Sequence, residues 1–151
     1  MIRHLRLGVI GLGHLGRYHA EKVAQISLAG LWGKSILSSH EEAPKVELKG
    51  ICDINEERLE EVANLLLEGY GLKPFKTKNF EEVLPLVDAV IVATPTSIHY
   101  ELVKKALLEG KAVLVEKPLT ADLSEAKELV KLAEDKGLLL QVGYVERFQR
   151  V

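Results

Sequence analysis

The sequence predicts a single α/β domain built on a doubly wound parallel sheet. Short apolar segments alternate with amphipathic segments of helical period. The apolar segments also lack the polar alternation of a sheet that has one solvated face. Repeated β–α units of this kind imply right-handed crossovers, with helices on both faces of the sheet. The length of 151 residues suits one domain.

Six short segments are predicted to be strands, of which residues 88–93 (DAVIVA) are the most strand-like and residues 5–10 form an apolar run that ends in glycines. They comprise residues 5–10, 46–52, 74–77, 88–93, 112–115 and 138–142. The helices predicted between them comprise residues 14–26, 56–68, 81–84 (a single turn), 98–109 and 122–136. Asp122 is a suitable N-cap for the helix at residues 122–136. Gly110 and Gly137 are suitable residues to end the helices at 98–109 and 122–136, respectively. Residues 27–44 fit neither class and are predicted to be an inserted surface loop, with room for a short helix.

The composition is that of an ordinary globular protein, with 47% hydrophobic and 28% charged residues and a net charge of −2. Nothing in it predicts a nucleic-acid or membrane partner, because either would call for a clustered basic face. Cys52 is the single cysteine, so no internal disulfide is possible. No metal site is expected. No apolar run approaches the roughly 18 residues that span a bilayer. We therefore expect a cytoplasmic location.

The first chemical motif is G-x-G-x-x-G at residues 11–16, directly after a predicted strand and at the start of a predicted helix. In that position Gly11 allows a tight turn, Gly13 lets the backbone approach a pyrophosphate, and Gly16 lets the helix pack closely on the strand. The N-terminus of the helix offers free N–H groups and partial positive charge to phosphates. The alternative is a glycine-rich turn that binds no ligand.

Asp53 follows the second strand, where a carboxylate can accept hydrogen bonds from the adenosine-ribose hydroxyls and repel the 2′-phosphate of NADP. No Arg or Lys occurs among residues 54–57, so the sequence favours NAD over NADP. The separation of Gly16 and Asp53 exceeds the usual spacing of about 20 residues, and the 27–44 segment accounts for the excess. The alternative is that Asp53 caps the next helix, and it could also do both.

The turn TPTS at residues 94–97 follows the fourth predicted strand, on the edge where ligands bind in open α/β sheets. Thr96 or Ser97 could simply cap the following helix. From its position in the first turn of that helix, His99 is expected to lie at the surface or near the cap.

Glu116-Lys117-Pro118 ends the fifth predicted strand on the same edge. Pro118 fixes the direction of Lys117, which could donate a proton to a substrate oxygen, or polarise it, during hydride transfer. The alternative is a Glu116–Lys117 pair on the surface. After the last strand, Tyr144 or Arg147 could lie near a substrate, or the segment could be a simple exit loop.

Five motifs carry a resemblance to one enzyme family, in matching order and on matching elements. They are GLGHLGRYHA from Gly11, Cys52-Asp53, ATPTSIHYE from Ala93, VEKPL from Val115 and VGYVERF from Val142. Together they resemble the glucose–fructose oxidoreductase / inositol dehydrogenase / MocA family over almost the whole chain. E-K-P after an A-T-P turn is the most specific feature, and the G-Y-V-E-R-F ending most resembles members that act on nucleotide sugars.

The resemblance implies a Rossmann-type fold, NAD as cofactor, and reversible hydride transfer between the nicotinamide and a carbon of a sugar, nucleotide sugar or polyol. The cofactor-binding residues that it implies are Gly11, Leu12, Gly13, His14, Leu15 and Gly16 around the pyrophosphate, Asp53 at the ribose, Thr94, Pro95 and His99 near the nicotinamide, and Glu116 and Lys117 at the reacting centre. Lys117 is the implied catalytic residue.

Family members usually continue into a second α/β domain with most substrate contacts and the oligomer interface, and we expect residues 1–151 to lack it. Three hypotheses follow: the cofactor-binding half of an enzyme, a standalone NAD-binding module without turnover, and a partner-binding domain that the nucleotide only stabilises. Lys117 favours the first over the third, whereas the chain length favours the second for these residues acting alone. Homo-oligomer formation is left open.

Overall fold

In a computed structural model of the chain, residues 4–29 and 45–144 are described. They form one six-stranded sheet of order β3-β2-β1-β4-β5-β6, in which every neighbouring pair is parallel. The strands are β1 His4–Ile10, β2 Lys45–Cys52, β3 Phe75–Thr77, β4 Ala89–Val92, β5 Ala112–Glu116 and β6 Leu140–Gly143. This order is that of a Rossmann-type sheet and confirms the predicted fold class.

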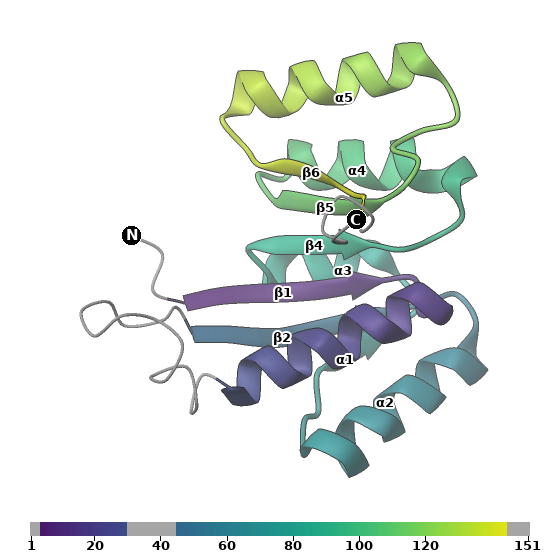
Figure 1. Ribbon diagram of the computed structural model, residues 1–151, viewed down its shortest axis with the longest axis vertical. Coiled ribbons are helices and arrows are strands. Elements are labelled where there is room, and N and C mark those ends of the chain that lie inside the picture. The colour runs from purple at the N-terminus through teal and green to yellow at the C-terminus, as the bar shows by residue number, and fades with distance from the viewer. Residues whose placement is uncertain (1–3, 30–44, 145–151) are drawn as a thin grey trace, which may run out of the picture.

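Helices cover both faces of the sheet (Figure 1). They are α1 His14–Ala29, α2 Glu56–Tyr70, α3 Phe80–Val83, α4 His99–Leu108 and α5 Leu123–Lys136, with short 3-10 turns at Leu84–Leu86 and Thr96–Ile98. On one face, α1 and α2 pack against an apolar core centred on Val9, Ile51 and Ile91. On the other face, α3, α4 and α5 pack against Val90, Val92 and further residues. The strands are therefore buried from both sides, as their continuous apolar character predicts.

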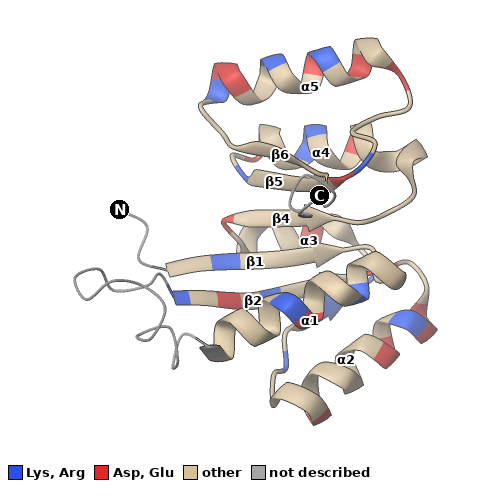
Figure 2. Ribbon diagram, viewed as in Figure 1, with Lys and Arg blue, Asp and Glu red and all other residues tan. Residues whose placement is uncertain are grey.

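Local sequence sets several of the helix ends. Asn55 caps α2 by accepting a hydrogen bond from the Arg58 N–H, and Gly71 ends that helix in the left-handed conformation. Asp122 caps α5 and Gly137 ends it, as predicted from the sequence. Figure 2 shows Lys and Arg interspersed with Asp and Glu along α5, which is typical of a solvated helix face.

The helices differ from their predicted bounds by one to three residues, and the differences at α1 and α4 change an interpretation of the sequence. Helix α1 extends to Ala29, so residues 27–29 belong to the helix, and residues 30–44 lie outside the described part of the chain. Helix α4 begins at His99 after a 3-10 turn, and among the described residues neither Thr96 nor Ser97 provides a side-chain cap for it. The proposal that one of these two residues caps the helix is therefore wrong, because the chain winds through residues 96–98 before α4 begins.

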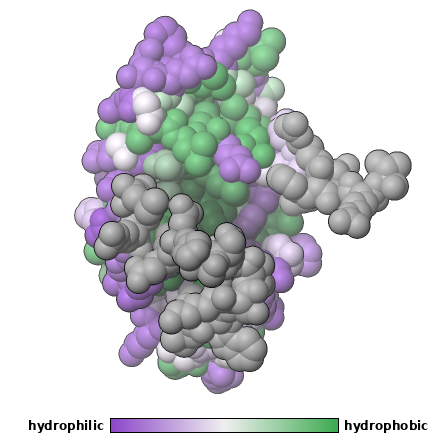
Figure 3. All heavy atoms as spheres, turned by 60° about the vertical axis from the view of Figure 1, so that its left-hand side comes forward, coloured by the Kyte–Doolittle hydropathy of each residue, from purple (hydrophilic) through white to green (hydrophobic). Residues whose placement is uncertain are grey.

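Apolar side chains are exposed on the part of the molecule that is formed by β5, β6 and α5. Figure 3 shows apolar area gathered in its upper half, where Figure 1 places these elements. Val130, Leu139 and Tyr144 are among the exposed apolar residues there. Within residues 4–29 and 45–144, none of the helices has the length and apolar character needed to cross a membrane.

Candidate dinucleotide site

The predicted functional residues that the structure describes lie at the carboxyl edge of the sheet. Parallel strands end at the same edge, so the residues after β1, β2, β4 and β5 become neighbours although they are far apart in sequence (Figure 1). The strand order reverses between β1 and β4, and open α/β sheets bind ligands in the crevice at such a reversal. Backbone hydrogen bonds tie the loops there: the Gly11 N–H donates to Cys52 O and the Ala93 N–H to Ile10 O, both at 2.8 Å.

Two of the three motif glycines are required by the fold itself. Gly11 has φ +86°, and a Cβ on it would lie 2.6 Å from the carbonyl oxygen of Ala93. A Cβ on Gly16 would lie 1.6 Å from the carbonyl oxygen of Gly11, inside the distance of any allowed contact. Gly11 therefore permits the turn and Gly16 permits close packing of α1 on the loop, as the motif predicts.

Gly13 is different, because the protein around it leaves open space. The nearest heavy atom to a Cβ on Gly13 would be Nη1 of Arg58, at 4.0 Å, and Gly13 does not have positive φ. Gly13 stands just before α1 and accepts the Arg17 N–H at 2.9 Å, while the first turn of α1 contains no acidic residue. The N–H groups of that turn have no helical partner and carry partial positive charge. This arrangement fits a pyrophosphate.

Other residues of the loop contribute mainly through the backbone. The side chain of Leu12 is buried, with 3% exposed, whereas those of His14 and Leu15 are exposed. The N–H of Leu12 donates to Oδ2 of Asp53 at 2.7 Å. The loop is thus tied directly to the end of β2.

Asp53 is a buried carboxylate with 7% exposed area. Besides the bond from Leu12, its Oδ1 accepts the N–H of Asn55 at 2.8 Å. Asn55, not Asp53, caps α2, so the interpretation of Asp53 as a helix cap is wrong. A carboxylate has about four acceptor positions, so these two bonds leave capacity for ribose hydroxyls.

Arg58 is a site residue that the sequence analysis missed. Its Nη1 lies 3.9 Å from Oδ2 of Asp53, and the side chain is 54% exposed. The cation lies one residue beyond the 54–57 segment, because Arg58 is in the first turn of α2, which starts beside the end of β2. A residue in that turn points back toward the strand end, and this helical geometry was the signal available in the sequence.

His99 is buried, with 1% exposed area, and the expectation of a surface or capping histidine is wrong. Its Nδ1 lies 2.9 Å from the carbonyl oxygen of Pro118, and its Nε2 lies 2.8 Å from that of Thr94. The ring therefore connects the turn after β4 with the turn after β5. Thr94 is half-buried and Pro95 is exposed at the edge of the sheet.

Glu116 is 5% exposed and forms a hydrogen-bonded pair with His19 of α1, with Oε1 and Nε2 2.5 Å apart. The alternative of a Glu116–Lys117 surface pair is wrong, because burial of Glu116 directs its carboxylate toward α1 instead. Lys117 is exposed, and its peptide bond to Pro118 is cis. His19 is the second site residue that the sequence analysis missed.

The end of β6 lies at the same edge. A Cβ on Gly143 would lie 3.1 Å from Oε2 of Glu116, so β6 ends against that carboxylate. Tyr144 follows and is 48% exposed, and Arg147 lies outside the described residues. Within the described part of the chain, no group of three or more His, Cys, Asp or Glu side chains is arranged to hold a metal ion.

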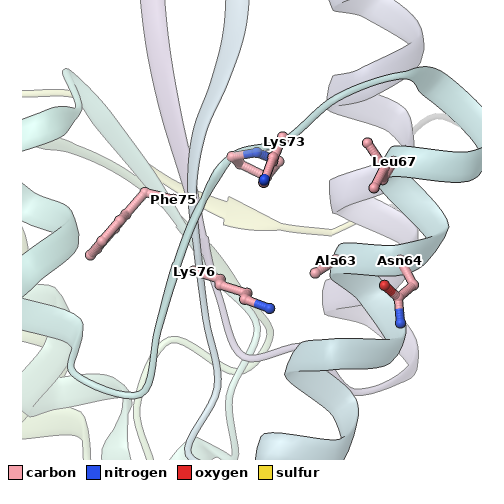
Figure 4. A pocket seen from close by; sticks show the side chains of 7 residues that line it. Ala63, Asn64, Leu67, Lys73, Phe75 and Lys76 are labelled. Atoms are coloured by element: carbon pink, nitrogen blue, oxygen red, sulfur yellow. The ribbon is translucent and has the colours of Figure 1, made fainter.

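A separate hollow lies between α2 and β3 (Figure 4). Its lining residues are Ala63, Asn64, Leu67, Lys73, Pro74, Phe75 and Lys76. They come from the C-terminal half of α2 and the start of β3, whereas Asp53 and the glycine loop adjoin the opposite ends of these elements. The hollow is therefore not part of the carboxyl-edge site.

The sequence pattern of the Gfo/Idh/MocA family, described as an oxidoreductase family with an NAD-binding Rossmann fold, matches residues 5–144. The chain belongs to this family. It is similar to UDP-N-acetylglucosamine 3-dehydrogenase of Acidithiobacillus ferrooxidans, with 37% identity over 144 residues that cover 95% of the chain and 38% of that enzyme. A solved structure of that enzyme superposes with a TM-score of 0.76 and covers 97% of this chain and 40% of its own.

The Gfo/Idh/MocA domain is also similar to scyllo-inositol 2-dehydrogenase (NAD(+)) of Bacillus subtilis, with 36% identity over 151 residues. That match covers 98% of this chain and 38% of the enzyme. The chain thus spans about two fifths of the length of these relatives. Their family relationship confirms an NAD-binding Rossmann domain.

Proposed function

We propose that this chain provides the cofactor-binding half of an oxidoreductase that transfers hydride between NAD and a hydroxyl-bearing carbon of a sugar, nucleotide sugar or polyol. The observation that carries the proposal is the open space at Gly13, at the N-terminus of α1 and beside the Asp53 carboxylate. Packing requires glycine at positions 11 and 16, whereas no protein atom requires it at position 13, which supports a ligand that approaches the backbone there.

The residues around this space have complementary roles. N–H groups in the first turn of α1 would bind the pyrophosphate, and the backbones of Leu12, His14 and Leu15 would line it. Asp53 would accept hydrogen bonds from the adenosine-ribose hydroxyls. Thr94 and Pro95 would lie beside the nicotinamide half, because their turn follows the strand next to β1.

Asp53 also supports a preference for NAD over NADP, since its negative charge would repel a 2′-phosphate. Arg58 opposes this effect, because its guanidinium lies 3.9 Å from the carboxylate and would attract the same phosphate. The buried carboxylate is held by two backbone N–H groups, whereas Arg58 is more than half exposed and screened by water. The carboxylate therefore dominates, and we propose a preference for NAD of moderate size.

Lys117 is the proposed catalytic residue. The bound cofactor supplies the hydride acceptor or donor, and Lys117 would hold or transfer the proton of the substrate oxygen. Its side chain is exposed at the sheet edge, while the neighbouring Glu116 and Pro118 are both engaged in hydrogen bonds to histidines. This leaves an exposed ammonium group on a backbone that is held on both sides.

The names of the relatives support a substrate with ring hydroxyls, because one acts on UDP-N-acetylglucosamine and another on scyllo-inositol. The G-Y-V-E-R-F segment, with Tyr144 and Arg147 as proposed substrate contacts, favours a nucleotide sugar. We propose that the isolated chain binds the cofactor but turns substrate over poorly. Robust sugar-dependent reduction of NAD by the chain alone would contradict this.

Calorimetric titration of the chain with NAD and, separately, with NADP tests the proposal. Binding of NAD with weaker binding of NADP would support both the site and the cofactor preference. Tighter binding of NADP would overturn the preference while leaving the site intact. Binding of neither would overturn the proposed function.

A further inference from the structure

His99 bridges the two turns that flank the proposed reacting centre. Its ring is almost completely buried, and its two nitrogens lie 2.9 and 2.8 Å from backbone carbonyl oxygens of Pro118 and Thr94. One carbonyl belongs to the turn after β5 and the other to the turn after β4. The histidine itself begins α4, so three elements meet at one imidazole.

The chemistry of the two partners restricts what the ring must do. A carbonyl oxygen accepts hydrogen bonds and cannot donate them, so the ring must donate from both nitrogens to bond both oxygens. The neutral imidazole carries one N–H, whereas the imidazolium carries two that point away from each other. A glutamine amide also has two N–H donors, but both are on one nitrogen. It therefore cannot place one donor at each end of the site, as the two ring nitrogens of His99 do.

The bridge fixes the backbone on one side of Lys117, and a second contact fixes the other side. Pro118 directly follows Lys117, and Glu116 directly precedes it and is held by His19 at 2.5 Å. At the other end of the bridge, the γ-methyl of Thr94 lies only 2.8 Å from where a Cβ on Gly11 would be. The turn that His99 holds is thus in contact with the glycine loop.

We propose that His99 is a positioning residue that holds the turns carrying Thr94 and Lys117 in register against the nicotinamide half of the bound dinucleotide. The inference rests on the proposed function, because Lys117 and the nicotinamide are assigned there. Since an edge turn held by a buried bridge loses little freedom on binding, the bridge would contribute pre-organisation without touching the ligand.

The test separates the two halves of the ligand. We would measure the affinity of the wild type, His99→Gln and His99→Phe for NAD and for ADP-ribose, which lacks the nicotinamide. Loss of one or both bridging bonds should weaken NAD binding by about tenfold, with ADP-ribose binding unchanged. Tyr100→Phe is the matched control, because Tyr100 is the next residue of α4 but bonds Glu128 of α5. This control should bind both ligands as the wild type does.

Equal weakening of NAD and ADP-ribose binding, or no change in either, would overturn the positioning role. Nitrogen NMR of His99 in the ligand-free wild type gives a second test that needs no variant to fold. Protons on both ring nitrogens would support the bridge, and one bare nitrogen would overturn it whatever the cofactor results. A wild type that binds ADP-ribose but not NAD would overturn the nicotinamide assignment, whereas binding of neither would overturn the proposed function as well.

Discussion

Replacing Gly13 with alanine separates the folding role of the glycine loop from its binding role. The added Cβ would have no protein atom nearer than 4.0 Å, and the backbone at Gly13 does not have the positive φ that disfavours alanine. Gly16→Ala is the matched comparison, because its Cβ would be 1.6 Å from the carbonyl oxygen of Gly11. The two variants add the same methyl group three residues apart.

The expected effects on stability differ in size. At Gly13 the weaker capping by alanine is offset by the lower entropy of the unfolded chain, so the free energy of unfolding should change by less than about 1 kcal/mol. At Gly16 the loop and α1 must separate to admit the methyl group, and we expect a loss of at least about 3 kcal/mol. Binding should respond in Gly13→Ala, where the methyl occupies the space proposed for the pyrophosphate. Overpacking of about 1–3 kcal/mol corresponds to roughly fivefold to 150-fold weaker NAD binding.

The assay is denaturant unfolding followed by circular dichroism, together with calorimetric titration of NAD. Wild-type affinity in Gly13→Ala would refute the reasoning that the backbone at this position approaches the ligand. A loss of stability in Gly13→Ala equal to that in Gly16→Ala would refute the argument from open space.

Three further predictions concern the cofactor preference, the ion pair between Arg6 of β1 and Asp88 before β4, and the buried cysteine. Asp53→Ser should lower the ratio of NAD affinity to NADP affinity measured by calorimetry. In the double variant with Arg58→Ala, the gain in NADP binding should be reversed. An unchanged ratio in Asp53→Ser would show that Asp53 does not select the cofactor. The Arg6 guanidinium lowers the pKa of Asp88 from 3.8 to about 2, so the pair stabilises the fold above the unfolded pKa and loses this effect as the pH falls through that range. In chemical denaturation at pH 7, Asp88→Asn should therefore have a lower free energy of unfolding than the wild type, and this difference should shrink between pH 4 and pH 2. A difference that does not depend on pH would contradict the stabilising role of the ion pair. Burial raises the pKa of the Cys52 thiol to about 11. A disulfide reagent at pH 8 should therefore label Cys52 slowly in the native chain and quickly in denaturant. Fast labelling of the native chain would show that β2 opens.

The fold was predictable because its determinants are local. The apolar segments, the Asp122 cap and the glycine stops each act within a few residues, and all recur in the structure. The strand-end positions of Asp53 and Lys117 followed from the rule that parallel strands end together. The end of α1 was predicted three residues too early, although no glycine or proline occurs among residues 27–29 and Gly30 directly follows Ala29.

The contacts that support the site could not be predicted, because they depend on packing between distant segments. His19 and Glu116 are 97 positions apart, and neither residue type indicates the other. His99 has the sequence context of an ordinary first helical turn, and only the approach of the turns after β4 and β5 buries it. Arg58 was the exception, since helix geometry alone would have placed it near Asp53.

The hydrogen-bonded pair of His19 and Glu116 links helix α1 to the end of β5. Helix α1 presents its N-terminus where the pyrophosphate would lie, and the same helix is joined through His19 to the residue before Lys117. Helix α1 and the His19–Glu116 hydrogen bond therefore set the separation between the N-terminus of α1 and Lys117. A dinucleotide bound as proposed would therefore meet Lys117 at a separation that the fold sets before binding.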